Sequence, residues 1–203
     1  WEYNKHLYFS RIGQILRNEG REWGVIKYAP VSETKHCVRL DWHEDFIVHL
    51  AGLIRPRVYV ELGLFRCALF NRIIPLAEQL IGVDISAEAG KAMQASPKAR
   101  FFKGTTQDFA RELAVRPLQI DMLFIDADHA QTAVLQDFQS YFPFVAPHGL
   151  ILLHDTHPRD QAMMDPKWCG TACQAAEVLA QDTRAYELMT IPVPPGLTIC
   201  RKR

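Results

Sequence analysis

The residues best suited to chemistry form two short polar clusters, and each cluster follows an apolar stretch. The first cluster is Asp126-Ala127-Asp128-His129, directly after residues 120–125, and the second is His154-Asp155-Thr156-His157, directly after residues 150–153. Short apolar runs of this kind indicate strands that are buried on both faces. Because ligands bind outside the carboxyl ends of strands in open parallel sheets, we expect the two clusters to share one site.

Asp126, His154 and Asp155 are the residues of these clusters that we expect to hold a metal ion. If the two strands are neighbours, their ends bring two carboxylates and one imidazole within reach of the same cation. This ligand set suits Mg²⁺, Mn²⁺ or Fe²⁺. The alternative is that the clusters are helix caps and surface ion pairs.

The sequence predicts alternating strands and helices, which would bring the two clusters to the same edge of a sheet. Apolar runs predict strands at residues 58–62, 80–83, 99–103, 120–125, 150–153, 186–191 and 197–201, with a turn at 147–149. Helical patterns lie between them at 68–80, from 86, at 106–114, 130–141 and 171–181, and Pro75 must kink or break the first. This alternation is typical of a doubly wound, mostly parallel α/β sheet. The link between the last two strands is too short for a parallel crossover, so one of them runs antiparallel.

The first 55 residues have a different pattern. A helix is expected to about Asn18, followed by an irregular stretch over residues 29–40 and a second helix that Pro56 ends. Asp41 resembles the N-cap of that helix, with Glu44 three residues later completing a capping box. We therefore divide the chain into an N-terminal helical segment, residues 1–55, and an α/β domain, residues 56–203.

Three further strand ends carry residues that could contact a ligand. Gly63, after the first strand, allows a tight turn and a close approach of the backbone to a ligand. Asp84 ends the second strand, where a carboxylate can accept hydrogen bonds from ribose hydroxyls or cap the next helix. The third strand leads to Gly104-Thr105-Thr106-Gln107-Asp108, whose polar side chains could bind an adenine edge or cap a helix.

Composition narrows the class of protein. The 203 residues include 23 Lys plus Arg and 23 Asp plus Glu, so the net charge is zero. Bulk charge therefore does not favour a nucleic-acid or anionic-membrane partner, and no apolar run approaches the length of a membrane span. The odd count of five Cys indicates free thiols in a reducing compartment, so we expect a cytoplasmic protein. A homo-oligomer is compatible with the aromatic and Met residues of the loops.

Five segments of the chain together resemble a known family. They are residues 58–63 (Val-Tyr-Val-Glu-Leu-Gly), 82–84 (Gly-Val-Asp), 104–108, 124–129 and 149–156. In order and spacing they resemble class I S-adenosylmethionine-dependent methyltransferases. The resemblance covers residues from about 56 to 201. It is strongest to cation-dependent O-methyltransferases of the catechol and caffeoyl-CoA types and of the antibiotic-sugar type that includes macrocin and mycinamicin methyltransferases. It implies a seven-stranded sheet whose last strand is antiparallel, with residues 1–55 as a lid or part of the substrate pocket.

The resemblance also implies roles for individual residues. Glu61 and Gly63 would lie beside the methionine part of S-adenosylmethionine, and Asp84 would hold its ribose. Thr106 and Gln107 would border its adenine. Asp126 would lie near the cofactor and bind the cation together with His154 and Asp155. His129 stands where the family carries its base, and it would take the proton from a small-molecule hydroxyl acceptor.

Two residues depart from the family pattern. Cys67 stands where the family usually has a Gly next to the cofactor, and His154 stands where Asp or Glu is usual and favours Mn²⁺ or Fe²⁺ over Mg²⁺. These departures keep a non-catalytic methyltransferase-fold protein that binds a nucleoside or a partner as the main alternative. Two further readings are a hydroxylase of the same fold, resembling cephalosporin hydroxylases, and a nicotinamide-dependent oxidoreductase. The missing glycines of G-x-G-x-x-G argue against the oxidoreductase.

Overall fold

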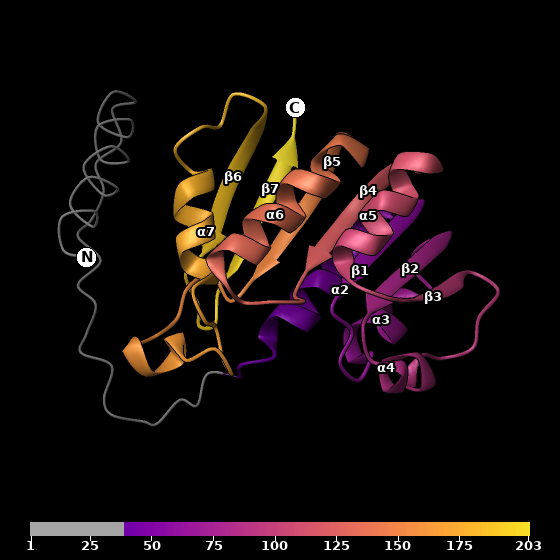
Figure 1. The fold of residues 1–203 in the computed structure, drawn as a ribbon, viewed down its shortest axis with the longest axis horizontal. Coiled ribbons are helices and arrows are strands. Elements are labelled where there is room, and N and C mark those ends of the chain that lie inside the picture. The colour runs from indigo at the N-terminus through magenta and orange to yellow at the C-terminus, as the bar shows by residue number, and fades with distance from the viewer. Residues whose placement is uncertain (1–38) are drawn as a thin grey trace, which may run out of the picture. The chain divides into compact units, whose positions relative to one another are not determined.

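Seven strands form one sheet in the computed structural model, which describes residues 39–203 (Figure 1). The strand order is β3-β2-β1-β4-β5-β7-β6. The strands are β1 (Val58–Leu62), β2 (Gln79–Asp84), β3 (Ala99–Lys103), β4 (Ile120–Ile125), β5 (Val145–His154), β6 (Tyr186–Ile191) and β7 (Leu197–Lys202). The helices are α2 (Trp42–Ile54), α3 (Ala68–Ile73), α4 (Ala87–Ala92), α5 (Thr106–Val115), α6 (Gln131–Tyr141) and α7 (Ala172–Leu179), with short 3₁₀ turns η1 (Phe142–Phe144) and η2 (Gln161–Met164).

Strand direction confirms the predicted sheet. β1 pairs in parallel with β2 and β4, and β4 pairs in parallel with β5, from Met122 opposite Leu150 to Ile125 opposite Leu153. β7 is antiparallel to both β5 and β6. The order of strands reverses between β1 and β4, so the chain crosses to the other half of the sheet there. The carboxyl ends of β1, β2, β4 and β5 therefore meet at one edge, where a doubly wound sheet binds ligands.

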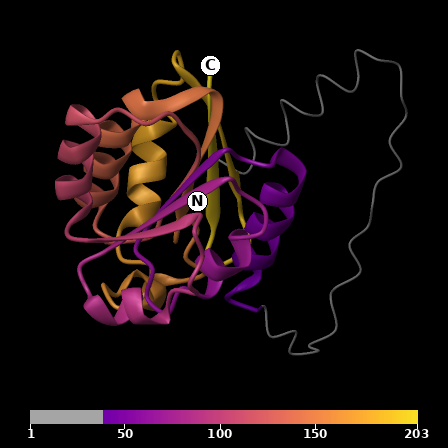
Figure 2. The ribbon, with the colours of Figure 1, turned by 90° about the vertical axis from the view of Figure 1, so that its right-hand side faces the viewer.

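Two helical layers cover the two faces of the sheet (Figures 1 and 2). On one face, Phe109 of α5, Phe138 of α6 and Ala175 of α7 pack against apolar side chains of the strands. On the other face, Ile47 and Ala51 of α2 pack together with residues from α3 and α4. Figure 2 shows α5 to α7 on the left of the sheet and α2 on the right. Burial on both faces explains why the central strands β1, β2 and β4 are largely apolar, whereas the edge strands β3 and β6 carry charged side chains.

The helix before the sheet, α2, is present, but its predicted capping box is wrong. Asp41 occupies the N-cap position and makes no side-chain capping bond. Its carboxylate instead accepts hydrogen bonds from the Arg39 guanidinium at 3.0 and 3.1 Å. The predicted helix to Asn18 and most of the irregular stretch lie outside the described residues. The division of the chain at residue 55 stays a prediction.

Two predicted boundaries are also wrong. α3 ends at Ile73 rather than near residue 80, because Pro75 lacks the N–H that a continuing helix needs. β5 begins at Val145 and includes the predicted turn at 147–149. Between the pairs Ile120–Val145 and Met122–Leu150, β4 advances two residues and β5 five, so β5 bulges there, with His148 at φ +64°. Across residues 39–203, none of the helices is long and apolar enough to span a membrane.

Candidate functional site

A cavity of about 660 Å³ lies at the carboxyl ends of the central strands. Its wall includes five of the predicted site residues, which are Glu61, Gly63, Asp84, Asp126 and His154. The cavity therefore lies at the edge of the sheet where the sequence predicts that a ligand binds. Thr106, Gln107, His129 and Asp155 do not line it.

A second cavity, of about 420 Å³, lies beside the first. His129 and Asp155 line it, and it shares Phe65, Asp126 and His154 with the first cavity. Asp126 and His154 thus lie where the two cavities meet. A group bound in one cavity would be next to a group bound in the other.

Glu61 is a buried acid that faces the first cavity from β1. Its side chain is 3% exposed, and its Oε2 accepts a hydrogen bond of 2.6 Å from the Tyr59 hydroxyl. Burial raises the pKa of Glu61 well above its usual range, against the effect of the Tyr59 bond. A buried acid of this kind ionises readily only when a positive group binds next to it.

Gly63 joins the ends of three strands. It adopts φ +85°, and a Cβ at this position would overlap with the carbonyl oxygen of Asp126. Its N–H donates to the Val83 carbonyl at 2.9 Å, and the Asp126 N–H donates to the Leu62 carbonyl at 2.8 Å. The chain therefore needs glycine here, because only glycine lets the β1 loop lie directly against the Asp126 backbone.

Asp84 holds the loop that follows β1. Its Oδ2 accepts hydrogen bonds from the Leu64 and Phe65 N–H groups at 2.9 and 3.2 Å, and its Oδ1 accepts from the Ser86 N–H at 2.7 Å. A carboxylate has about four acceptor positions. One remains for a ligand hydroxyl, and Asp84 lines the first cavity.

Thr106 and Gln107 point toward α6. The Thr106 hydroxyl and the Gln107 amide both donate to Oδ1 of the buried Asp137, at 2.6 and 2.9 Å. Thr105 and Asp108 form a capping box at the start of α5. The segment after β3 therefore caps a helix, as one of the two sequence readings has it, and a contact of Thr106 and Gln107 with adenine stays a prediction.

Cys67 has its thiol turned away from the cavities. Its backbone is left-handed at φ +55°, the conformation that glycine adopts most easily. The side chain is fully buried, and the thiol donates to the Ala89 carbonyl of α4 at 3.1 Å. Burial raises the pKa of Cys67 to about 11. The neutral thiol packs into the core, and Cys67 lines neither of the two cavities.

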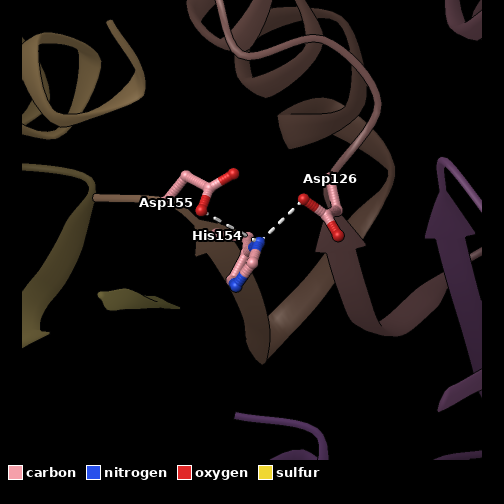
Figure 3. Close-up of side chains that lie close together, drawn as sticks. All are labelled: Asp126, His154 and Asp155. Carbon is pink, nitrogen blue, oxygen red and sulfur yellow. Dashed lines mark hydrogen bonds and ion pairs between the residues drawn. The ribbon is translucent and has the colours of Figure 1, made fainter. Parts of the chain in front are cut away.

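Asp126, His154 and Asp155 lie together at the ends of β4 and β5 (Figure 3). His154 Nδ1 lies 2.9 Å from Asp126 Oδ1 and 3.5 Å from Asp155 Oδ1. Asp155 is buried and adopts φ +59°, which turns the chain sharply after β5. The two neighbouring strand ends therefore form the three-residue cluster that the sequence predicts.

His129 borders the same cluster from the loop after β4. Its Nε2 lies 3.3 Å from Asp155 Oδ2 and 3.6 Å from Asp126 Oδ1. Its Nδ1 is bonded to the backbone carbonyl of Trp168. Because a carbonyl oxygen only accepts, Nδ1 carries the hydrogen, and Nε2 is the nitrogen that faces the carboxylates. Asp128, next to it, accepts from the Ala130 N–H at 2.8 Å and so helps to begin α6.

Charges within the metal-free cluster shift its pKa values strongly. Burial lowers the pKa of His154, but Asp126 and Asp155 outweigh this effect and raise it to about 10. The hydrogen bond to Asp126 raises the pKa of His129 to about 9. Burial would raise the pKa of Asp126, yet His154 and His129 hold it well below its usual range. The carboxylates therefore favour the protonated form of both imidazoles.

His43 of α2 is a site residue that the sequence reasoning missed. Its ring packs against that of His154, with centroids 3.8 Å apart and ring planes inclined by 40°, and it also lies near Phe124. Its Nδ1 lies 3.1 Å from His154 Nε2 and 3.3 Å from the Leu40 carbonyl oxygen. Burial, followed by the charge of His154, lowers the pKa of His43 to about 4. A neutral ring from α2 therefore covers His154. Only its position at the start of an amphipathic helix could have suggested this.

The geometry of the cluster fits a divalent cation. One ligand atom from each of Asp126, His154 and Asp155 lies within 4.8 Å of the others. A cation with bonds of about 2.1 Å holds adjacent ligands about 3 Å apart and opposite ligands about 4 Å apart. The 2.9 and 3.5 Å separations around His154 Nδ1 suit adjacent ligands. Carboxylate ligands suit Mg²⁺, and the imidazole shifts the preference toward Mn²⁺ or Fe²⁺.

Known proteins match the chain in sequence pattern and in fold. The sequence model of a family described as "Methyltransferase domain" matches residues 11–156. An O-methyltransferase from Bacillus cereus, in complex with SAH, has a TM-score of 0.68 at 12% identity, over 96% of this chain and 90% of that chain. No curated protein sequence matches the chain.

Two more solved structures share the fold. The O-methyltransferase TomG from Streptomyces achromogenes, in complex with SAM, has a TM-score of 0.62 at 19% identity, over 79% of both chains. The MycE methyltransferase of the mycinamycin pathway, in complex with Mg and SAH, has a TM-score of 0.58 at 18% identity. That match spans 79% of this chain and 49% of MycE. At these identities the likeness is one of fold.

Proposed function

Because the chain belongs to the methyltransferase domain family and is an S-adenosylmethionine-dependent methyltransferase, we propose that it is an O-methyltransferase for a hydroxyl group of a small molecule, assisted by a divalent cation. The observation that carries this proposal is the meeting of the two cavities at Asp126 and His154. A methyl donor in the first cavity and an acceptor in the second would be adjacent there. Adjacency of two reactants supplies a large part of the rate in a transfer reaction.

We assign the first cavity to S-adenosylmethionine. Glu61 would accept the ammonium of the methionine part, whose positive charge favours the ionised acid. Arg66 is the one Lys or Arg in the described wall of this cavity, so it is suited to the carboxylate of the same part. Asp84 would use its free acceptor position for a ribose hydroxyl. Gly63 keeps the β1 loop close to Asp126.

We assign the cation to Asp126, His154 and Asp155, with His154 binding through the Nδ1 that faces both carboxylates. The cation, when bound, would polarise the acceptor hydroxyl and lower its pKa. The cofactor would supply a methyl carbon whose bond pair stays on sulfur while the acceptor oxygen forms the new C–O bond. Asp126 borders both cavities and would align the two reactants.

His129 is the base in this proposal. Its Nδ1–H is committed to the Trp168 carbonyl, so Nε2 is the nitrogen that can take the hydroxyl proton. In the metal-free site the carboxylates raise the pKa of His129 to about 9. Cation binding at Asp126 and Asp155 would offset their negative charge, so the imidazole would become neutral and able to accept a proton.

The first test is a calorimetric titration with S-adenosylmethionine, with and without Mn²⁺. We expect binding in both cases and methyl transfer to a hydroxyl probe only with the metal. No detectable binding at millimolar cofactor would contradict the enzyme proposal. Binding and transfer without any effect of metal would contradict the role of the cation.

The second test separates a base from a ligand. We expect His129→Ala to reduce kcat by about 10²–10⁴-fold and to leave the affinities for cofactor and Mn²⁺ nearly unchanged. His49→Ala, the same substitution at an exposed position of α2, is the control and should match the wild type. An equal loss of kcat and of Mn²⁺ affinity would show that His129 is a metal ligand instead.

A further inference from the structure

The second cavity has a largely apolar wall. Apart from the cluster residues, its lining includes Leu40, Phe65, Met163, Trp168 and Pro195. Phe65 is 80% and Trp168 57% exposed, so two aromatic side chains remain open at this cavity. Large exposed aromatic side chains beside a hollow mark a place where an apolar ligand binds. A flat, apolar body suits such walls.

The loop that carries Trp168 is fixed to the site. The Trp168 carbonyl accepts from His129 Nδ1–H, and the Thr171 N–H donates to the His129 carbonyl at 2.8 Å. Gly170 adopts φ +52°, and a Cβ there would crowd the backbone of His129. These contacts hold the residues between them against the loop of the base. Lys167, next to Trp168, therefore starts from a defined position on the wall.

Lys167 gives this apolar cavity a positive charge. It is the one Lys or Arg in the described lining. Among residues 39–203, no side-chain or carbonyl oxygen forms an ion pair or hydrogen bond with its ammonium; only its backbone N–H is bonded, to Asp165 Oδ1 at 2.9 Å. The charges of Asp126 and Asp155 would be balanced by a divalent cation. The charge of Lys167 then remains for the ligand.

From these features we propose that the acceptor is a planar, largely apolar hydroxyl compound that carries a carboxylate. Its hydroxyl would lie at Asp126, His154 and Asp155, its flat body against Trp168, and its carboxylate at Lys167. This inference rests on the proposed function, because it takes the second cavity as the acceptor site. It specifies which acceptor the second cavity binds and leaves the reaction unchanged. The hydroxyl proton would still go to His129, and the methyl group would still be transferred to the acceptor oxygen.

The test compares two probes that share a pair of hydroxyls and differ in one carboxylate, 3,4-dihydroxybenzoate and 1,2-dihydroxybenzene. Binding to the full chain with Mn²⁺ is measured by calorimetry, so it does not depend on turnover. We expect the benzoate to bind more tightly. Lys167→Gln should weaken the benzoate by about fivefold, the effect of an exposed ion pair, and leave the neutral probe unchanged.

Two further variants control this result. Arg116→Gln removes the same charge from an exposed position at the end of α5 and should change neither affinity. Trp168→Ala should weaken both probes by a similar factor, because both rings would lie against the indole. Equal binding of the two probes, equal loss of both in Lys167→Gln, or no binding of either would overturn the inference.

Failure of this inference and failure of the proposed function give different results. The proposed function depends on binding of S-adenosylmethionine and Mn²⁺, which is measured on the same samples without a probe. Cofactor and metal binding combined with indifference to the carboxylate would overturn only the acceptor class. Absence of cofactor binding would overturn the proposed function.

Discussion

The two halves of the site are held together in different ways. At the ends of β1 and β2, Asp84 is fixed by backbone N–H groups of Leu64, Phe65 and Ser86. At the ends of β4 and β5, the carboxylates of Asp126 and Asp155 are surrounded by imidazoles. Backbone N–H groups keep their hydrogens at every working pH, whereas imidazoles gain and lose protons. The half that we assign to the cofactor is therefore set by the fold, whereas the half that we assign to the acceptor depends on the protonation of its imidazoles.

The largest expected effect comes from removing one carboxylate charge from each half of the site in turn. Asp126→Asn should abolish cation binding and reduce methyl transfer by about 10³-fold, since metal assistance is worth several kcal/mol. Asp84→Asn should weaken S-adenosylmethionine by about tenfold, the effect of one charged hydrogen bond, with Mn²⁺ affinity unchanged. Calorimetry with each ligand and steady-state kinetics give both numbers. Equal loss of Mn²⁺ affinity in the two variants would show that the halves are not independent.

The next effect concerns the contact that joins the halves. Gly63→Ala forces a Cβ against the Asp126 carbonyl at a left-handed position, so we expect a loss of about 3 kcal/mol in the free energy of unfolding. Gly52→Ala in α2, with nothing within 4 Å of the added Cβ, is the matched control and should stabilise by about 0.5–1 kcal/mol. Urea unfolding measures both. A mild effect of Gly63→Ala would mean that the β1 loop can move away from β4.

The features of the structure that could be predicted from the sequence also fall into two groups. The central strands could be predicted because burial on both faces makes them largely apolar. The short link before β7 indicated its reversal. The start of β5 could not, because Pro147, His148 and Gly149 have the composition of a turn and only pairing with Ile120 extends the strand. Asp126 and Asp155 were found because strand ends have a fixed place in this topology.

The residues that other elements bring to the site could not be predicted. His43 contacts His154 only because α2 packs on this face of the sheet, and no local pattern specifies that packing. The loop of Trp168 and Lys167 is held at the site by the His129 side chain and by a backbone bond from Thr171 to His129, neither of which can be read from the sequence. Thr106 and Gln107 show the reverse situation, in which residues predicted to contact a ligand already have a partner within the protein. Both side chains donate to the buried Asp137, so a contact with adenine would compete with these hydrogen bonds.

A smaller effect tests whether α2 belongs to the acceptor half. His43→Ala removes the ring that packs against His154 and should weaken Mn²⁺ binding by about 10–100-fold, as loss of a group that orients a metal ligand does. His43→Phe keeps a ring of similar shape and should retain most of the affinity. Calorimetry with Mn²⁺ and, separately, with S-adenosylmethionine distinguishes loss of orientation from loss of folding. Equal weakening in both variants would mean that His43 acts through its nitrogens.

The smallest effect is a dependence of stability on pH that belongs to the acceptor half alone. In the folded, metal-free protein the pKa of His129 is raised to about 9 and that of His154 to about 10, from 6.5. The folded state therefore binds more protons than the unfolded state between these values. This stabilisation is complete below pH 6.5 and is lost as the pH rises through 9 and 10. The Tm of chelated protein should therefore fall as the pH rises from 6.5 to 9.5, at about 3 °C for each kcal/mol lost.

Saturating Mn²⁺ should remove this fall, because a metal-bound imidazole has already given up its proton and metal affinity rises with pH. His49→Ala, which removes an exposed imidazole of α2, is the control and should show the same fall in Tm as the wild type. His129→Gln in the chelated protein should reduce the fall, because one of the two titrating imidazoles is gone. A Tm that is constant over this range without metal, or that falls equally with Mn²⁺ bound, would show that the carboxylates at β4 and β5 are not held by protonated histidines.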